Sequence, residues 1–130
     1  MMLQMKSVLL VALGGALGSV ARYLVSGWTL HHTVDWRFPL GTFIVNVIGC
    51  LLVGVLGGLV VKHDLLSGEA RLLLFTGLAG GFTTFSAFGL ETFNLLRRDE
   101  ILVATGYVAS SVLIGLLVLW LGFSVVSPRS

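Results

Sequence analysis

Residues 80–88 read GGFTTFSAF and lie inside an otherwise apolar segment of the chain. Two adjacent glycines, Gly80 and Gly81, weaken a helix, and the Thr and Ser hydroxyls compete for its backbone hydrogen bonds. Hydrocarbon offers no partner to an opened backbone, which survives only where it is buried in protein or lines a wet cavity. This stretch therefore predicts a broken membrane helix at which an ion binds or passes.

The composition of the whole chain is typical of a membrane protein. Of its 130 residues 56% are hydrophobic and 11% are charged, and the mean hydropathy is +1.02, whereas soluble domains carry about 25% charged residues. Uncharged runs of 24, 19 and 28 residues occupy positions 38–61, 72–90 and 101–128. Each is close to or beyond the ~20 residues that cross hydrocarbon. A fourth apolar segment begins at Ser7 and contains Arg22 toward its end.

We predict an all-α membrane protein with one domain, residues 1–130, in which the third of four transmembrane helices is broken between Gly80 and Ser86. The four predicted spans are residues 5–27, 40–61, 71–96 and 101–126. A cleaved signal peptide is the alternative for the first segment, but glycines recur there at helical spacing and three more spans follow.

Seventeen glycines in such a chain call for a physical reason. Pairs four residues apart let helices approach closely, and they occur at Gly14/Gly18, Gly54/Gly58 and Gly77/Gly81. We therefore expect tight packing between helices, including helices of different subunits.

Basic residues are evenly divided between the two predicted membrane faces. Lys6, Lys62, Arg71 and Arg129 share one face with the N-terminus, and Arg22, Arg37, Arg97 and Arg98 lie on the other. Orientation normally follows an excess of Lys and Arg in cytoplasmic loops, and neither face has one. Either a single dominant loop sets the orientation, or the chain inserts both ways and pairs antiparallel with itself. The basic residues flank spans without forming a patch, so we expect no nucleic-acid partner.

The sequence contains no recognisable catalytic arrangement, so we predict that the protein is not an enzyme. Its three histidines lie in loops without a carboxylate cluster, and the single cysteine, Cys50, lies inside a span. Asn46 is the polar residue of the second span, where it could join helices or donate to an anion. Hydroxyl and carboxyl groups at membrane depth are supplied by Thr83, Thr84, Ser86, Glu91, Tyr107, Ser110 and Ser111.

Phe85 and Phe88 are three residues apart and therefore share one face of a helix. An ordinary packing stripe explains most such pairs. However, the edge of an aromatic ring is positive, and ring edges beside hydroxyl and amide donors would suit a small, hard anion. No Lys or Arg lies in the middle of a predicted span, so we expect an anion to bind weakly enough to leave, as conduction requires.

Three motifs occur in order on the first three predicted spans. They are Gly14-Gly15-x-x-Gly18-x-x-x-Arg22, Gly41-Thr42-x-x-x-Asn46-x-x-Gly49 and Gly80-Gly81-x-Thr83-Thr84-Phe85-Ser86-x-Phe88-x-x-Glu91. With these motifs the chain resembles the Fluc (CrcB) fluoride channels along essentially its whole length. The resemblance implies an antiparallel, dual-topology homodimer with two fluoride pores in the inner (cytoplasmic) membrane. The implied function is passive, fluoride-selective export from the cytoplasm, which lowers fluoride toxicity.

The resemblance also implies roles for individual residues. Backbone carbonyls of Gly80 and Thr83, from both subunits, would hold a structural sodium ion that is not transported. Asn46, Phe85 and Phe88 match pore residues, and Arg22 matches a vestibule arginine. The matches to a polar track are Thr84, Ser86, Glu91, Tyr107, Ser110 and Ser111. Hydroxyl residues common in the family are replaced here by Ala87 and Gly89.

Two other functions are compatible with four short spans. A small multidrug exporter coupled to protons would also insert both ways, but it needs a carboxylate deep in the first span, and residues 5–27 contain none. A non-transporting membrane scaffold would use the glycines and Asn46 for packing alone.

Overall fold

The chain folds into helices that are long enough to cross a bilayer. The structure is a computed structural model that describes residues 1–33 and 35–126. Within these residues four helices are long and apolar enough to span a membrane: Met2–His32, Leu40–His63, Gly68–Arg97 and Ile101–Val126. We call Gly68–Arg97 the third span. The predicted all-helical architecture with a bent third helix is confirmed, whereas Arg129 of the charge count lies outside the described residues.

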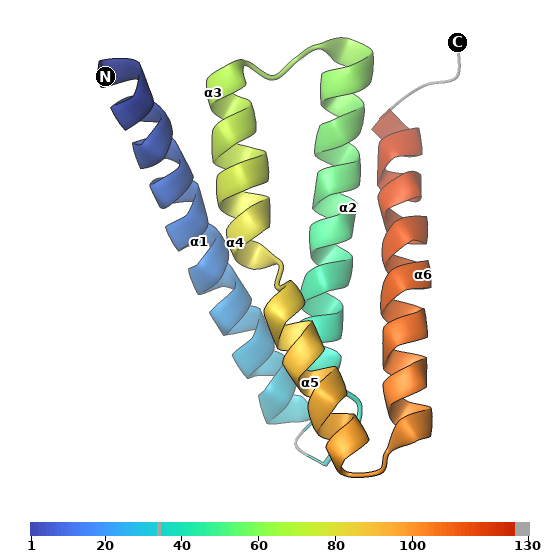
Figure 1. Ribbon diagram of the computed structural model, residues 1–130. Coiled ribbons are helices and arrows are strands. Elements are labelled where there is room, and N and C mark those ends of the chain that lie inside the picture. Colours follow the sequence, from blue (N-terminus) through green and yellow to red (C-terminus); the bar gives the residue numbers. More distant parts are fainter. Residues whose placement is uncertain (34, 127–130) are drawn as a thin grey trace.

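The first helix, α1 (Met2–His32), runs further than the sequence pattern predicts. It continues to His32 rather than ending at residue 27, because no Gly or Pro follows Gly27 within it and His31 and His32 suit the negative end of the helix dipole. With 31 residues α1 exceeds the length that a bilayer core requires, and Figure 1 shows it inclined against the other spans. Arg22 consequently lies well inside α1.

The helices associate in two close pairs. α1 packs against the first half of the third span, which consists of α3 (Gly68–Arg71), the π-helical segment η1 (Leu72–Ala79) and α4 (Gly80–Phe82). α2 (Leu40–His63) packs against α6 (Ile101–Val126). The second half of the third span, α5 (Phe85–Arg97), leaves α1 and crosses to α6, as Figure 1 shows. The break in the third span thus links the two pairs.

Glycines permit both pairs to pack closely. A Cβ atom on Gly77 would lie 2.9 Å from the Cα of Gly14, and a Cβ on Gly18 would lie 2.8 Å from the backbone nitrogen of Phe82. On the other pair, a Cβ on Gly54 would collide with the carbonyl of Leu119 in α6. The prediction that these glycines bring helices together is confirmed for contacts within one chain.

The break in the third span falls at Thr83 and Thr84. Both have extended backbones, with φ/ψ of −84°/155° and −149°/112°. Gly80 remains helical at −63°/−39°, so the glycines do not form the break as the sequence suggested. Gly81 serves close packing instead, because a Cβ there would lie 2.6 Å from the Gly15 carbonyl oxygen of α1.

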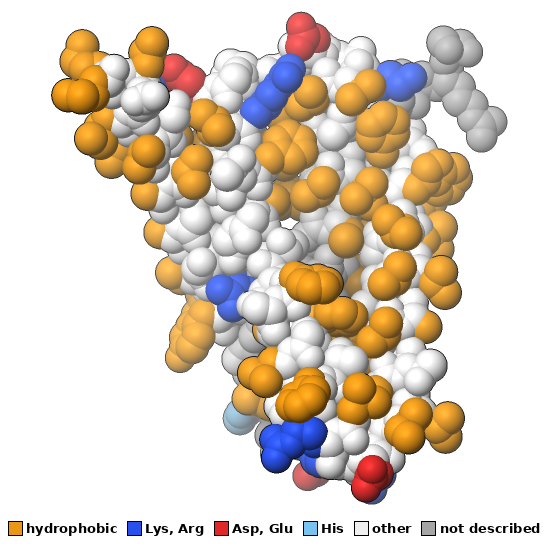
Figure 2. All heavy atoms as spheres, viewed as in Figure 1, with side chains coloured by type: hydrophobic (Ala, Val, Ile, Leu, Met, Phe, Trp, Pro, Cys, Tyr) orange, Lys and Arg blue, Asp and Glu red, His pale blue; other side chains and the backbone are white. Residues whose placement is uncertain are grey.

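The surface is apolar over the length of the spans. Figure 2 shows hydrophobic side chains over the middle of the visible face and most charged side chains at its two ends. In α5, for example, Leu90 and Phe93 are 60% and 59% exposed. An apolar surface of this extent needs lipid or protein around it, and the chain is a multi-pass membrane protein.

Neighbouring glycines of α1 provide a test of the packing. We expect Gly14→Ala to destabilise the protein by about 1–3 kcal/mol, because the new Cβ meets the backbone of Leu73 and Gly77, which cannot yield as a flexible side chain would. Gly15→Ala is the matched control, since a Cβ at Gly15 meets nothing within 4 Å. Unfolding in detergent micelles measures both, and equal stability of the two variants would contradict the packing.

Candidate functional site

The break is held open by the side chain of Asn46. Its Oδ1 accepts a hydrogen bond from the Thr84 N–H at 2.9 Å, and its Nδ2 donates to the Thr84 carbonyl at 3.2 Å. The Asn46 side chain thus pairs with both backbone groups of Thr84, as a residue of a neighbouring strand would. Asn46 does join helices, and its NH₂ group retains a second hydrogen for another acceptor.

At the break, two side-chain oxygens accept hydrogen bonds from backbone N–H groups in place of the carbonyls of a continuous helix. In a continuous α-helix the Thr84 N–H would donate to the Gly80 carbonyl, but here it donates to Asn46. The Ala87 N–H would donate to the Thr83 carbonyl, but here it donates to the Thr84 hydroxyl, which caps α5 at 3.2 Å. The carbonyls of Gly80 and Thr83 are thereby released from their helical donors.

Arg22 reaches the break from α1. Its Nε donates to the Gly81 carbonyl at 3.2 Å, so a guanidinium satisfies a third carbonyl that the break has opened. Because the break is close to the middle of the third span, a basic side chain of α1 reaches the middle of that span, which the sequence did not predict. The sequence predicted that Arg22 lies near the end of the first helix. Because α1 continues to His32, that end lies further along the chain than predicted.

A row of aromatic rings leads from the break toward the α1–α2 connection. The ring centroids of Phe85 and Phe88 are 5.7 Å apart, and those of Phe88 and Tyr107 are 5.1 Å apart. Phe38 follows at 5.3 Å from Tyr107, with its ring nearly perpendicular, and Phe43 continues the row. The sequence pointed to Phe85, Phe88 and Tyr107 but not to Phe38 and Phe43.

A carboxylate with two hydroxyl donors lies beside this row. Glu91 accepts a hydrogen bond from Thr42 at 2.7 Å through Oε1 and from Tyr107 at 2.8 Å through Oε2. Thr42 is part of the second sequence motif, but the sequence predicted no function for it. Its position four residues before Asn46, on the same face of α2, was the available indication.

The remaining polar residues have different surroundings. The Thr84 and Ser86 hydroxyls are 3.4 Å apart at the start of α5. The Ser110 hydroxyl donates to the Tyr107 carbonyl at 3.3 Å. The Ser111 hydroxyl is buried and has no hydrogen-bond partner among the described residues, so it is free to donate to a small ligand.

Two cavities lie at the ends of the aromatic row. One, of about 300 Å³, is lined at the break by Asn46, Cys50, Thr84, Phe85 and other residues. The second, of about 310 Å³, lies at the α1–α2 connection and is lined by Thr42 and Glu91 among others. Polar groups and rings therefore connect one hollow to the next along α5.

Comparison with known proteins identifies the family. A family model described as "CrcB-like protein, Camphor Resistance (CrcB)" matches residues 9–123. The chain belongs to the CrcB family. A relative in Methylobacillus flagellatus, named "Fluoride-specific ion channel FluC", is 57% identical over 122 residues, which cover 94% of this chain and 95% of the relative.

Other CrcB relatives bear the same name. The protein of Flavobacterium psychrophilum is 44% identical over 118 residues, covering 91% of this chain and 94% of its own length. The protein of Rhizobium etli is 46% identical over 121 residues, covering 93% and 96%. The family expected from the three motifs is confirmed.

The pairing of Asn46 with Thr84 predicts a local effect of substitution. We expect Asn46→Ala to lower the free energy of unfolding by about 2–4 kcal/mol, because two backbone groups lose their partner at membrane depth. The Thr84 amide should also exchange its hydrogen faster in detergent micelles. Asn94→Ala, the same change at a residue of the third span, is the control. Unaltered Thr84 exchange in Asn46→Ala would contradict the pairing.

Proposed function

We propose that the protein is a passive, fluoride-selective ion channel of the inner (cytoplasmic) membrane. It would export fluoride from the cytoplasm and so lower its toxicity. The observation that carries this proposal is the 57% identity, over nearly the full length of both chains, to a protein named a fluoride-specific ion channel. The aromatic row beside Asn46 and Glu91 supports it chemically.

The first part of the proposed pore runs from the cavity at the break along Phe85 and Phe88. Fluoride entering beside Asn46 would meet the second amide hydrogen of that side chain and the Thr84 and Ser86 hydroxyls. The N-terminal end of α5 lies at the same place and favours negative charge. Ring edges then replace water around the ion.

The second part of the proposed pore is a track of hydroxyl groups. Tyr107 and Thr42 both bond to Glu91, so the carboxylate fixes two hydroxyl groups beside the rings. The Ser111 hydroxyl is a free donor on α6, and Ser110 lies next to it. Small, rigid donors of this kind fit fluoride, whereas a larger halide would be excluded by size and incomplete coordination.

We also propose that two copies assemble antiparallel, with one pore in each half. Among the described residues, the membrane face at the N-terminus carries Lys6, Lys62 and Arg71, and the opposite face carries Arg37, Arg97 and Arg98. Balanced charge permits insertion in both orientations. Gly80 and Ser86, beside the break, are exposed in one chain. Polar backbone does not face lipid, so a second copy is the natural cover.

A structural sodium ion fits the opened backbone. The carbonyls of Gly80 and Thr83 have lost their helical donors, and carbonyl oxygens suit a hard cation. No group of three or more His, Cys, Asp or Glu side chains among the described residues could hold a metal instead. When bound, the ion would supply fixed positive charge that joins the two broken helices at the dimer centre without being transported.

The alternatives make different demands on the chain. A proton-coupled multidrug exporter needs a carboxylate in its first span, and Met2–His32 contains neither Asp nor Glu. A non-transporting scaffold needs no pore and would carry no fluoride across the membrane. Release of fluoride from loaded liposomes, followed with a fluoride electrode, separates the channel from both.

Substitution of the rings tests the proposed pore. We expect Phe85→Ile and Phe88→Ile to reduce fluoride efflux by about tenfold, which corresponds to a barrier higher by ~1.4 kcal/mol, while the dimer survives. Phe93→Ile is the matched control, because Phe93 lies on the same helix but outside the row of rings formed by Phe85, Phe88 and Tyr107. Equal flux in all three variants would rule out a role for ring edges.

Removal of sodium tests the opened carbonyls. Exchange of sodium for a bulky organic cation should weaken the dimer and reduce fluoride efflux, because the carbonyls of Gly80 and Thr83 would then lack a counter-charge. Size-exclusion chromatography and efflux are the measurements, with potassium as a second small cation for comparison. A dimer and a flux that are insensitive to the cation would argue against the site.

A further inference from the structure

We propose that the cavity at the α1–α2 connection is an anion-concentrating mouth of the pore, in which Arg37 and Arg98 raise the local concentration of fluoride. This inference rests on the proposed function and assigns a role to two arginines that the sequence motifs do not include. The resemblance to the fluoride channels pointed to Arg22 alone as a vestibule arginine, and the Arg22 Nε donates to the Gly81 carbonyl.

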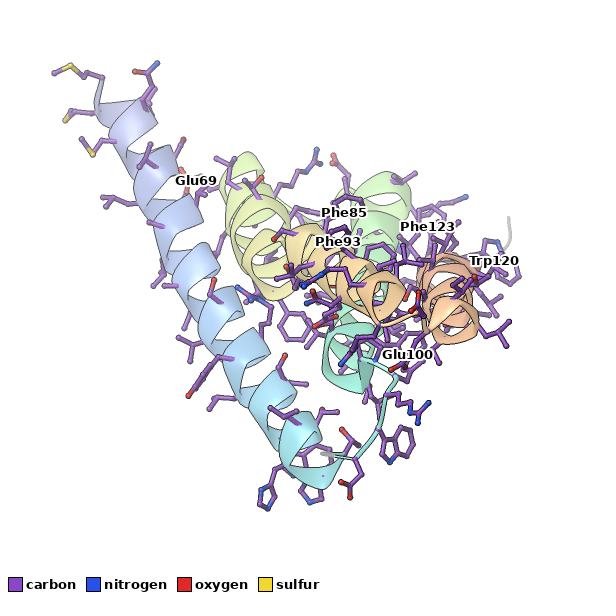
Figure 3. The ribbon with its side chains drawn as sticks, turned by 60° about the horizontal axis from the view of Figure 1, so that its bottom comes forward. Glu69, Phe85, Phe93, Glu100, Trp120 and Phe123 are labelled. Carbon is purple, nitrogen blue, oxygen red and sulfur yellow. The ribbon has the colours of Figure 1, made fainter. Side chains whose placement is uncertain are left out.

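The cavity connects the loop end of the molecule with the polar track. Its volume is about 310 Å³, which is room for several water molecules. Thr42 and Glu91, whose side chains bond to each other at 2.7 Å, form part of its lining. Arg37, Arg98 and Asn94 line it as well. Figure 3 brings this end of the molecule forward, with Glu100 labelled at the α5–α6 turn.

The charges of the lining explain why the arginines are needed. Glu91 presents a carboxylate that, when ionised, repels an approaching anion. Arg37 and Arg98 give the lining two positive charges against this one. Low-dielectric walls of Leu30, Phe38 and Leu40 concentrate the field inside such a hollow and raise the local concentration of the opposite ion.

The two arginines should not contribute equally. The Arg98 Nε lies 3.9 Å from Glu100 Oε1, and the Arg98 side chain is 61% exposed. A neighbouring carboxylate and solvent both weaken its effect on an anion. The described residues form no ion pair with Arg37 within 4.0 Å, so we infer that Arg37 acts more strongly.

The chain supplies a matched control in Arg97. It is adjacent to Arg98 at the end of α5 and is exposed, but it lines a different hollow, with Asn94 and Arg98. Arg97→Gln therefore removes one charge from the same end of the protein without changing the lining of the mouth. Arg37→Lys keeps the charge and tests whether shape or charge matters.

The experiment is fluoride efflux from liposomes that contain the full chain, at two concentrations of an impermeant salt on both sides. At about 10 mM the screening length is ~30 Å, and at about 1 M it is ~3 Å. A unit charge at about 8 Å in water changes the local concentration of an ion about twofold, and more beside apolar walls. At low salt we expect fluoride efflux through Arg37→Gln to be about two- to fivefold lower than through the unsubstituted protein, and efflux through Arg98→Gln to be reduced less. At high salt we expect both variants to equal the unsubstituted protein.

Each result either supports the mouth or overturns it. At low salt, a smaller loss of efflux in Arg97→Gln than in Arg37→Gln, together with unchanged efflux in Arg37→Lys, completes the expected pattern. If Arg37→Gln and Arg98→Gln match Arg97→Gln at both salt concentrations, or if their losses persist at high salt, the arginines do not concentrate fluoride. Absence of efflux from the unsubstituted protein would instead refute the proposed function, so the two failures are distinguishable.

Discussion

The pairing of the Asn46 amide with the backbone N–H and carbonyl of Thr84 is the interaction on which the centre of this protein depends. A helix cannot open inside hydrocarbon unless its backbone groups find other partners. One side chain from α2 supplies both an acceptor and a donor to the same residue. The Thr84 hydroxyl then starts α5 by accepting from the Ala87 N–H. These local substitutions make a break that is stable at membrane depth.

The break has consequences on both sides. Toward α1, the opened Gly81 carbonyl receives the Arg22 guanidinium, which gives a charged group a partner where it would otherwise be costly. Away from α1, α5 changes direction and places Phe85, Phe88 and Glu91 beside α6. Glycine contacts between α1 and the first half of the third span hold that half in place. The aromatic row and the hydroxyl track therefore follow from where the third span turns.

Polar chemistry is concentrated along one line of an otherwise apolar molecule. Asn46 and Thr84 lie at one end of this line, the Glu91 carboxylate with its two hydroxyl donors lies further along, and two arginines line the cavity at the far end. A weakly bound anion can move along such a series because no single station supplies all its partners. The membership of the CrcB family and the physical arrangement thus lead to one proposed function.

The sequence by itself determined the membrane class, the four helices, the family and the approximate position of the break, because span length, apolar composition and motif spacing are local properties. It also marked Asn46, Phe85, Phe88, Glu91 and Tyr107. Only the tertiary structure decided that the threonines open while the glycines stay helical and that Arg22 reaches the break. It also decided that Thr42 bonds to Glu91, that Phe38 packs against Tyr107, and that Arg37 and Arg98 line the cavity beside Glu91. These features depend on which helices touch, and contacts between residues distant in sequence have no signature in the periodicity of either segment.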